Sequence, residues 1–155
     1  MKVREANEKD TFGIAEVLKA SYNISSIEEG VKTFNEENTK GHKYIVAEDG
    51  GKIIGLTTWV RHGLFKHQLC ELDRIAVLPD FQGKGVARQL FDALVKSANS
   101  EYKKNGSKLR KLYILTHADN KRAQEFYKKM GFSHETTLKD HYYAGKDEFV
   151  LSKFF

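Results

Sequence analysis

The stretch LDRIAVLPDFQGKGVA, residues 72–87, decides the fold. Its first part, Leu72–Leu78, predicts a strand, Pro79–Phe81 predicts a loop, and a long amphipathic helix is expected from Lys84 to about Lys104. The two glycines of Gln82–Ala87 let the backbone approach a ligand closely. A strand that leads through such a loop into a helix presents unpaired N–H groups and the positive end of the helix dipole. The stretch therefore predicts an anion-binding site.

Two phosphate-binding fingerprints do not fit this loop. The dinucleotide pattern G-x-G-x-x-G requires a third glycine where the chain has Arg88, and the P-loop requires Ser or Thr after Gly-Lys, where the chain has Gly85 and Val86. The loop alone thus leaves two interpretations open: an anion site, and an ordinary strand-to-helix turn whose glycines only relieve backbone strain.

Outward from the loop, hydrophobic periodicity and turn residues predict eleven elements in the order β-α-α-β-β-β-α-β-α-β-β. Ser26 and Glu29 predict a capping box for the second helix. The expected strands are residues 2–6, 42–48, 52–60, 70–78, 109–116, 133–138 and 148–154, and the expected helices run through 12–18, 27–38, 84–104 and 120–130. No repeat or linker is visible, so one domain is expected over residues 1–155.

Composition limits the compartment and the partners. Cys70 is the only cysteine, so no internal disulfide can form. The start, Met1–Glu5, has no apolar signal-like region, and no apolar run is long enough to span a membrane, so a cytoplasmic location and no membrane partner are expected. The net charge of +5 fits solvated helix faces or an attractive field for a polyanionic cofactor. No nucleic-acid partner is expected, because the basic clusters lack interleaved aromatic residues.

A second motif lies at residues 120–132, where an asparagine opens a helix that ends before Gly131–Phe132. Two motifs together resemble the GNAT superfamily of acyl-CoA-dependent N-acetyltransferases. The first is the loop Gln82–Ala87, which fits the pattern [QR]-x-x-G-x-[GA]. The second consists of Asn120 with Ala123, Phe126–Tyr127 and Gly131–Phe132. The order of elements fits the same superfamily from Lys2 to Phe155, so the resemblance covers the whole chain.

This resemblance implies an α/β (α+β) fold with a central mixed, mostly antiparallel sheet of about seven strands flanked by about four helices. The sheet would splay into a V between the strands at 70–78 and 109–116. The cosubstrate would be acetyl-CoA, with its pyrophosphate on the glycine loop, and no metal is expected. The implied cofactor-binding residues are Ile75, Ala76, Val77, Gln82, Gly83, Lys84, Gly85, Val86, Ala87, Asn120, Ala123 and Tyr127.

The same resemblance gives two catalytic candidates. Tyr127 would lie near the thioester sulfur, and a phenol is protonated at neutral pH and can donate to a thiolate. Glu71 lies eleven residues before Gln82, as a glutamate does in the histone acetyltransferase branch, and would act as the base. Asp73 could exchange roles with Glu71. The alternative is that Glu71 forms a strand-end salt bridge with Arg74 or Arg61.

Transfer is expected to go directly from acetyl-CoA to an amine in a ternary complex. A covalent route would need an activated nucleophile, and the only thiol, Cys70, is expected to be a small buried residue although His67 is near in sequence. The oxyanion donor would be a backbone N–H near Ile75–Val77. His117 is the one histidine expected to be worth testing as an auxiliary base.

The acceptor amine is not specified by the sequence. The pair Tyr142–Tyr143 resembles protein N-terminal acetyltransferases, but Leu115 stands where those enzymes commonly carry Glu or His. Small molecules, polyamines and peptides all stay open, and no acidic run typical of a polyamine pocket is visible. A non-catalytic acyl-CoA sensor on the same fold and a basic nucleic-acid-binding domain are the competing hypotheses. Apolar strand edges are also compatible with a homodimer.

Overall fold

A computed structural model describes residues 1–155. Its strands are β1 (Lys2–Glu5), β2 (Lys43–Asp49), β3 (Lys52–Arg61), β4 (Leu69–Val77), β5 (Lys111–His117), β6 (Ser133–Tyr143) and β7 (Lys146–Phe154). They form one seven-stranded sheet in the order β1-β2-β3-β4-β5-β7-β6. Every neighbouring pair is antiparallel except β4 and β5, which are parallel. The mixed, mostly antiparallel sheet is therefore confirmed.

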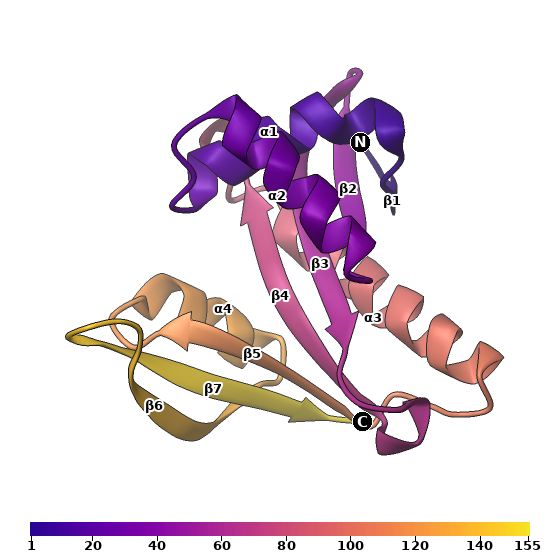
Figure 1. Cartoon of the computed structure of the whole chain (residues 1–155), viewed down its shortest axis with the longest axis vertical. Helices are drawn as coiled ribbons and strands as arrows, with labels where there is room; N and C mark the ends of the chain where they lie inside the picture. Colours follow the sequence, from indigo (N-terminus) through magenta and orange to yellow (C-terminus); the bar gives the residue numbers. More distant parts are fainter.

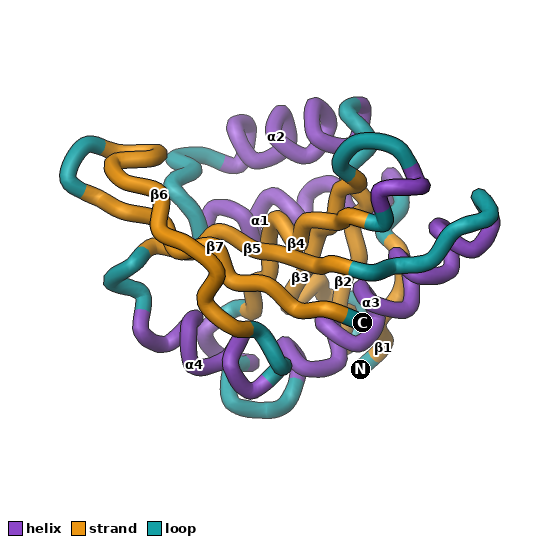
Figure 2. Tube along the Cα trace, turned by 90° about the horizontal axis from the view of Figure 1, so that it is seen from below, coloured by secondary structure: helices purple, strands orange, loops and turns teal.

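Four helices cover the two faces of this sheet. They are α1 (Thr11–Ser21), α2 (Ile27–Thr39), α3 (Val86–Lys104) and α4 (Lys121–Lys129), joined by the 3-10 turns η1 (Glu8–Asp10), η2 (Phe65–His67) and η3 (Pro79–Phe81). Figure 2 shows α1 and α2 on one side of the strands and α3 and α4 on the other. No helix combines the length and the apolar composition that crossing a bilayer requires.

Two hydrophobic clusters hold these layers together. The larger one lies between the sheet and α3 and α4, where Leu90 and Leu94 are fully buried. The smaller one lies between the sheet and α1 and α2, where Ile14 and Leu18 are fully buried. Each helix contributes the apolar side chains that recur at helical spacing, which is why the sequence pattern located all four helices.

Local capping explains where the helices begin. The Ser26 hydroxyl accepts from the N–H of Glu29 at 3.0 Å, as expected. The reciprocal half of the predicted capping box is wrong, because the Glu29 carboxylate accepts from the N–H and hydroxyl of Ser25 instead. The third helix begins at Val86 rather than Lys84, because Gly85 has a left-handed backbone with φ of 80°.

The last hairpin is longer than the sequence predicted. The strand expected at residues 133–138 extends to Tyr143, and its partner begins at Lys146 rather than Glu148. Almost all side chains of β6 are exposed, so the strand has no alternating apolar pattern to reveal it. Two hydrogen bonds brace the extension: the N–H of Gly145 donates to the Asp140 carboxylate, and the N–H of Asp140 donates to the Asp147 carboxylate.

The predicted V is present at the centre of the sheet. β4 and β5 pair only over three positions, from Leu69 opposite Lys111 to Glu71 opposite Tyr113. Beyond this vertex the two strands separate, and Figure 1 shows β4 (pink) and β5 (orange) starting together near the C-terminus and then diverging. A register shift in the β3–β4 pairing leaves Asp73 without a partner residue, and such a bulge increases local strand twist.

Candidate functional site

A cavity of about 1330 Å³ fills the V between β4 and β5. Its walls come from segments far apart in the sequence: the α1–α2 connection, both strands, the loop before α3, α4 and the last hairpin. A volume of this size is sufficient for a large cosubstrate together with an acceptor. All the residues expected to act as a site line this cavity except Lys84 and Val86. The side chain of Val86 is packed in the larger hydrophobic cluster instead.

The glycine loop forms one end of this cavity. Gly83 and Gly85 have φ of 74° and 80°, and a Cβ added to either would have no atom within 4 Å. The backbone N–H groups of residues 83–88 make no hydrogen bond within the protein. They surround the N-terminus of α3, where the helix dipole adds positive potential. This arrangement supports the anion-site interpretation of the loop.

Basic side chains reinforce this end. Lys84 is exposed within the loop, and Arg88 and Arg122 both line the cavity, from α3 and α4 respectively. Gln82 also lines the cavity. Its side-chain amide donates to the carbonyl of Val77 at 2.9 Å, so it braces the loop against β4.

The free edge of β4 faces the cavity beside this loop. The carbonyl of Ile75 accepts from the Tyr22 hydroxyl at 3.1 Å, and the carbonyl of Val77 accepts from Gln82. Both groups therefore point away from β3. Ala76 lies between them and directs its carbonyl at β3, close to Gly55. The backbones of Ile75 and Val77 can consequently pair with an extended ligand, whereas that of Ala76 is used by the sheet.

The fourth helix carries two of the predicted residues on the opposite wall. The Asn120 side chain accepts from the N–H of Ala123 at 3.1 Å and so caps α4. Tyr127 is only 4% exposed, yet it lines the cavity and its hydroxyl has no hydrogen-bond partner. Burial raises the pKa of Tyr127 well above its ordinary value of 10.0. The phenol is therefore protonated at neutral pH.

Glu71 stands at the vertex of the V. Its carboxylate lies 2.8 Å from Nε2 of His62 and 3.5 Å from the Tyr113 hydroxyl. The expected salt bridge with Arg74 or Arg61 does not form, because Arg74 binds Glu37 and Arg61 lies over the ring of Phe65. The partner of Glu71 is thus a half-exposed imidazole.

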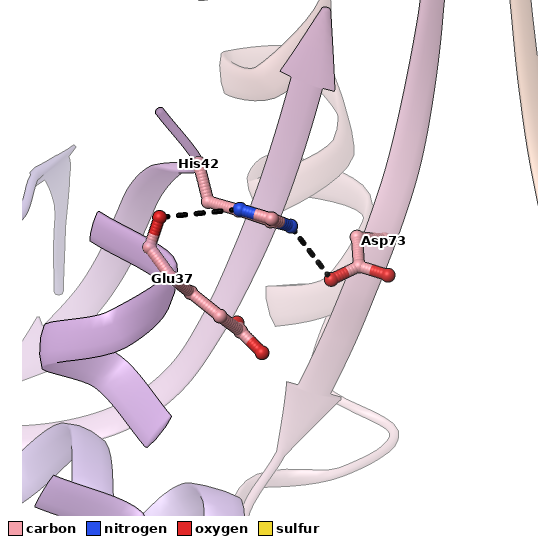
Figure 3. Close-up of side chains that lie close together, drawn as sticks. All are labelled: Glu37, His42 and Asp73. Carbon is pink, nitrogen blue, oxygen red and sulfur yellow. Dashed lines mark hydrogen bonds and ion pairs between the residues drawn. The ribbon is translucent and has the colours of Figure 1, made fainter. Parts of the chain in front are cut away.

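Asp73 lies near Glu71, two residues along β4. Its carboxylate is 3.4 Å from Nε2 of His42. Burial and the negative charge of Glu71 raise the pKa of Asp73 above its ordinary value. Figure 3 shows the His42 ring between this carboxylate and the backbone carbonyl of Glu37 at the end of α2.

Glu37, His42 and Asp73 offer ligand atoms that all lie within 4.8 Å of one another. Both carboxylate oxygens of Glu37 are already engaged, by the guanidinium of Arg74 and by the Tyr44 hydroxyl at 2.6 Å. Arg74 supplies the positive charge that this cluster requires, so the protein's own side chains explain the arrangement.

The sequence did not predict the role of Glu148. This residue on β7 is 2% exposed and stands opposite His117 on β5, and its carboxylate contacts Nδ1 of that imidazole. Both residues line the cavity. Glu148 was expected only as the start of a strand, and nothing short of the β5–β7 register shows that its side chain is buried behind His117.

Cys70 has the buried position that the sequence suggested. It is fully buried, and burial raises the pKa of its thiol far above the ordinary range. It does not line the cavity. A buried, protonated thiol is a poor nucleophile.

Comparison with known proteins supports one family. The profile described as Acetyltransferase (GNAT) domain matches residues 40–134. The chain is 31% identical over 100 residues to an uncharacterized N-acetyltransferase of Methanocaldococcus jannaschii, covering 62% of this chain and 41% of that protein. It is 28% identical over 123 residues to the N-alpha-acetyltransferase RimI of Mycobacterium tuberculosis, covering 77% of this chain and 72% of that protein.

Solved structures share the fold along the full length of the chain. An aminoglycoside 6'-N-acetyltransferase in complex with coenzyme A superposes with a TM-score of 0.81 at 14% identity, covering 99% of this chain and 97% of that chain. At such identity the likeness concerns the fold alone. In sequence, the match spans less than half of the length of the Methanocaldococcus protein.

Proposed function

The chain belongs to the acetyltransferase (GNAT) domain family, and from this premise we propose that it transfers the acetyl group of acetyl-CoA directly to a primary amine in a ternary complex. One observation carries the proposal. Three features surround the same cavity: the unpaired N–H groups of residues 83–88, the free edge of β4 at Ile75 and Val77, and the unpartnered hydroxyl of Tyr127. Together they match a phosphate-bearing molecule with an amide-bearing arm and a reactive end.

In this proposal acetyl-CoA supplies the thioester whose acetyl group is transferred. The N–H groups from Gly83 to Ala87 would hold its pyrophosphate, with Lys84 and Arg88 adding positive charge. Ile75 and Val77 would pair with the pantetheine arm, and Asn120 and Ala123 would border it from α4. Gln82 and Ala76 would contribute indirectly, by bracing the loop and β4.

Two side chains would move protons. Glu71 would take one proton from the bound ammonium, through water where needed, and His62 at 2.8 Å would pass it to solvent. The neutral nitrogen then attacks the carbonyl carbon, so the C–N bond forms and the C–S bond breaks. Tyr127 would give its proton to the leaving sulfur and regain one from the second N–H of the amine.

An acceptor panel read by thiol release tests this function. The panel contains amino acids, polyamines, aminoglycosides and short peptides, since the name of the RimI relative points to an α-amine and nothing in the chain excludes small amines. Wild type should release thiol with at least one of these amines. Glu71→Gln should lower kcat about 100-fold, while Glu135→Gln, on exposed β6 outside the cavity, should act as wild type.

Other results would favour the competing functions. Acetyl-CoA binding without transfer to any amine of the panel would indicate a non-catalytic sensor. Salt-sensitive DNA or RNA binding that acetyl-CoA does not compete with would indicate a nucleic-acid-binding domain. Unchanged turnover in Glu71→Gln would remove Glu71 from the mechanism and leave Asp73 as the next candidate.

A further inference from the structure

The cavity in the V has two ends of opposite charge. Arg88, Arg122 and the free N–H groups of the loop make one end positive. At the other end, the carboxylates of Glu71 and Asp73 on β4 and Glu148 on β7 line the cavity. The whole chain carries a net charge of +5, so the acidic end is a local feature of the folded site.

None of these three carboxylates is paired with lysine or arginine. Their charged-pair partners are His62 for Glu71, His42 for Asp73 and His117 for Glu148. An imidazole, unlike the ammonium of lysine or the guanidinium of arginine, is not a permanent cation, so none of the three carboxylates has a fixed positive charge beside it. The guanidinium on this face, that of Arg74, is bound by both carboxylate oxygens of Glu37.

Glu148 provides a second, independent sign of a ligand. A carboxylate that is 2% exposed is costly to keep without a cationic partner, and its one polar contact is an imidazole that is 39% exposed. Because Nδ1 of His117 faces the carboxylate, Nε2 is the ring nitrogen left for the cavity. The buried charge polarises the ring, which makes Nε2 a good acceptor for an ammonium N–H.

The other two carboxylates share the same space as Glu148. Burial raises the pKa of the Tyr142 phenol, and the negative charges of Glu71, Asp73 and Glu148 raise it further. Tyr142 lies on β6 and lines the cavity. A phenol that stays protonated keeps the wall uncharged on that side. A cation placed here would thus meet three carboxylates and no opposing basic side chain other than the neutralised Arg74.

The acidic groups are spaced so that one elongated cation can contact more than one of them. Glu71 pairs with Tyr113 at the vertex, and His117 lies four residues further along β5, a span of about 13 Å. A short monoamine would reach one end of this span only. A linear molecule with two charged nitrogens could place one near Glu71 and Asp73 and the other near His117 and Glu148.

We propose that the acceptor is a linear diamine or polyamine, held with its second ammonium group against His117 and Glu148. The inference rests on the proposed acetyl transfer and names the substrate class of the same site. The sequence could not predict it, because the carboxylates come from β4 and β7 and no acidic run typical of a polyamine pocket is visible in the chain.

Matched acceptors test the proposal with the wild-type protein. Putrescine and spermidine are compared with butylamine, with aminobutanol and with an alanine-initiated tripeptide of neutral side chains, all at one mildly alkaline pH. We expect kcat/KM for spermidine, the longer of the two polycationic amines, to exceed that of butylamine and aminobutanol by at least about tenfold, with the shorter putrescine between them. Rates within about threefold across these amines, or a preference for the peptide, would overturn the proposal.

Variants then test which carboxylates cause the preference for polycationic amines. Glu148→Gln and Asp73→Asn should each reduce the spermidine-to-butylamine ratio of kcat/KM by about tenfold, and the exposed control Glu135→Gln should keep it. An unchanged ratio in both folded cavity variants would contradict the proposal. If Glu148→Gln does not fold, the proposal is tested by Asp73→Asn and by the acceptor series with the wild-type protein.

A binding measurement separates this inference from the proposed function. Calorimetry with coenzyme A present should detect spermidine and no butylamine at the same concentration, whether or not any acetyl transfer occurs. Spermidine binding without transfer would contradict the proposed function and keep the inference. Transfer to monoamines without spermidine binding would keep the function and overturn the inference.

Discussion

The hydroxyl of Tyr22 donates a hydrogen bond to the carbonyl of Ile75 at 3.1 Å, across the mouth of the V. The tyrosine comes from the α1–α2 connection, and the guanidinium of Arg74 stacks over its ring at 4.6 Å. The occupied carbonyl belongs to the free edge of β4. A ligand that pairs with this edge therefore meets an acceptor that Tyr22 already uses.

Tyr22→Phe should tighten acetyl-CoA binding. Removing the hydroxyl frees the Ile75 carbonyl, and a hydrogen bond of this kind is worth about 1 kcal/mol, so calorimetry should show the Kd falling about threefold to tenfold. The unliganded variant should lose about 1 kcal/mol in denaturant unfolding for the same reason. Weaker acetyl-CoA binding would instead show that the hydroxyl itself contacts the cosubstrate.

Tyr127→Phe should lower kcat about 100-fold and leave the Kd of acetyl-CoA within about twofold, because the hydroxyl has no partner in the protein and is assigned only to the leaving sulfur. Since burial raises its pKa well above 10.0, loss of the Tyr127 proton should not limit kcat at any pH up to about 9. Thiol release measured over a pH series gives kcat and its pH dependence, and calorimetry gives the Kd of acetyl-CoA.

The control for Tyr127 is Tyr102→Phe. Tyr102 is equally buried, but its hydroxyl donates to the carbonyl of Leu69 and lies outside the cavity. This variant should lose about 1 kcal/mol of stability with little change in kcat. A similar fall in kcat for both variants would mean that Tyr127 acts through packing alone.

Gly85→Ala should weaken acetyl-CoA binding at least about tenfold. The new Cβ would enter the open space beside the loop, where the pyrophosphate is proposed to bind, and a left-handed alanine costs about 1 kcal/mol. Gly106→Ala is a matched control, since Gly106 has φ of 71° and equally open surroundings but lies after α3, away from the cavity. We expect the two variants to lose similar stability, and only Gly85→Ala to bind acetyl-CoA more weakly. Equal Kd values for acetyl-CoA in the two variants would exclude the anion site at the loop.

The local parts of this fold could be predicted because short stretches encode them. The strand–loop–helix at residues 72–104 needed only glycine positions and helical periodicity, and Asn120 indicated the start of α4. The extension of β6 could not be predicted, because its exposed side chains carry no alternating pattern. The Glu29 carboxylate likewise bonds Ser25 rather than Ser26, a choice between neighbours that composition does not decide.

The charged pairs of the site were beyond prediction for a different reason. Glu71 meets His62 and Glu37 meets Arg74 because of strand register and helix placement, which join residues far apart in the chain. The contact between Glu148 and His117 likewise exists only in the β5–β7 register. Residue type and spacing predicted which strands, loop and helix contribute to the site. Only the folded sheet shows which carboxylates lie together at one end of its cavity.

The carboxyl group of Asp73 should make stability depend on pH. In the unfolded chain its pKa is near the ordinary value of 3.8, and in the folded protein burial and Glu71 raise it. The folded state thus binds this proton more tightly, so the contribution to stability is present below the ordinary value and is lost as pH rises through the folded pKa. Wild type therefore carries a cost at neutral pH that a neutral side chain would avoid.

Asp73→Asn should accordingly be more stable than wild type in denaturant unfolding at pH 8 and differ little from it at pH 3. The amide can still accept from His42, so the variant keeps that contact. Asp92→Asn, at an exposed position on α3, should change stability by less than about 0.5 kcal/mol at both pH values. A variant less stable than wild type at pH 8 would contradict the raised pKa. A gain in stability combined with a lost preference for diamines would identify the buried carboxylate as a residue kept for its ligand at the expense of stability.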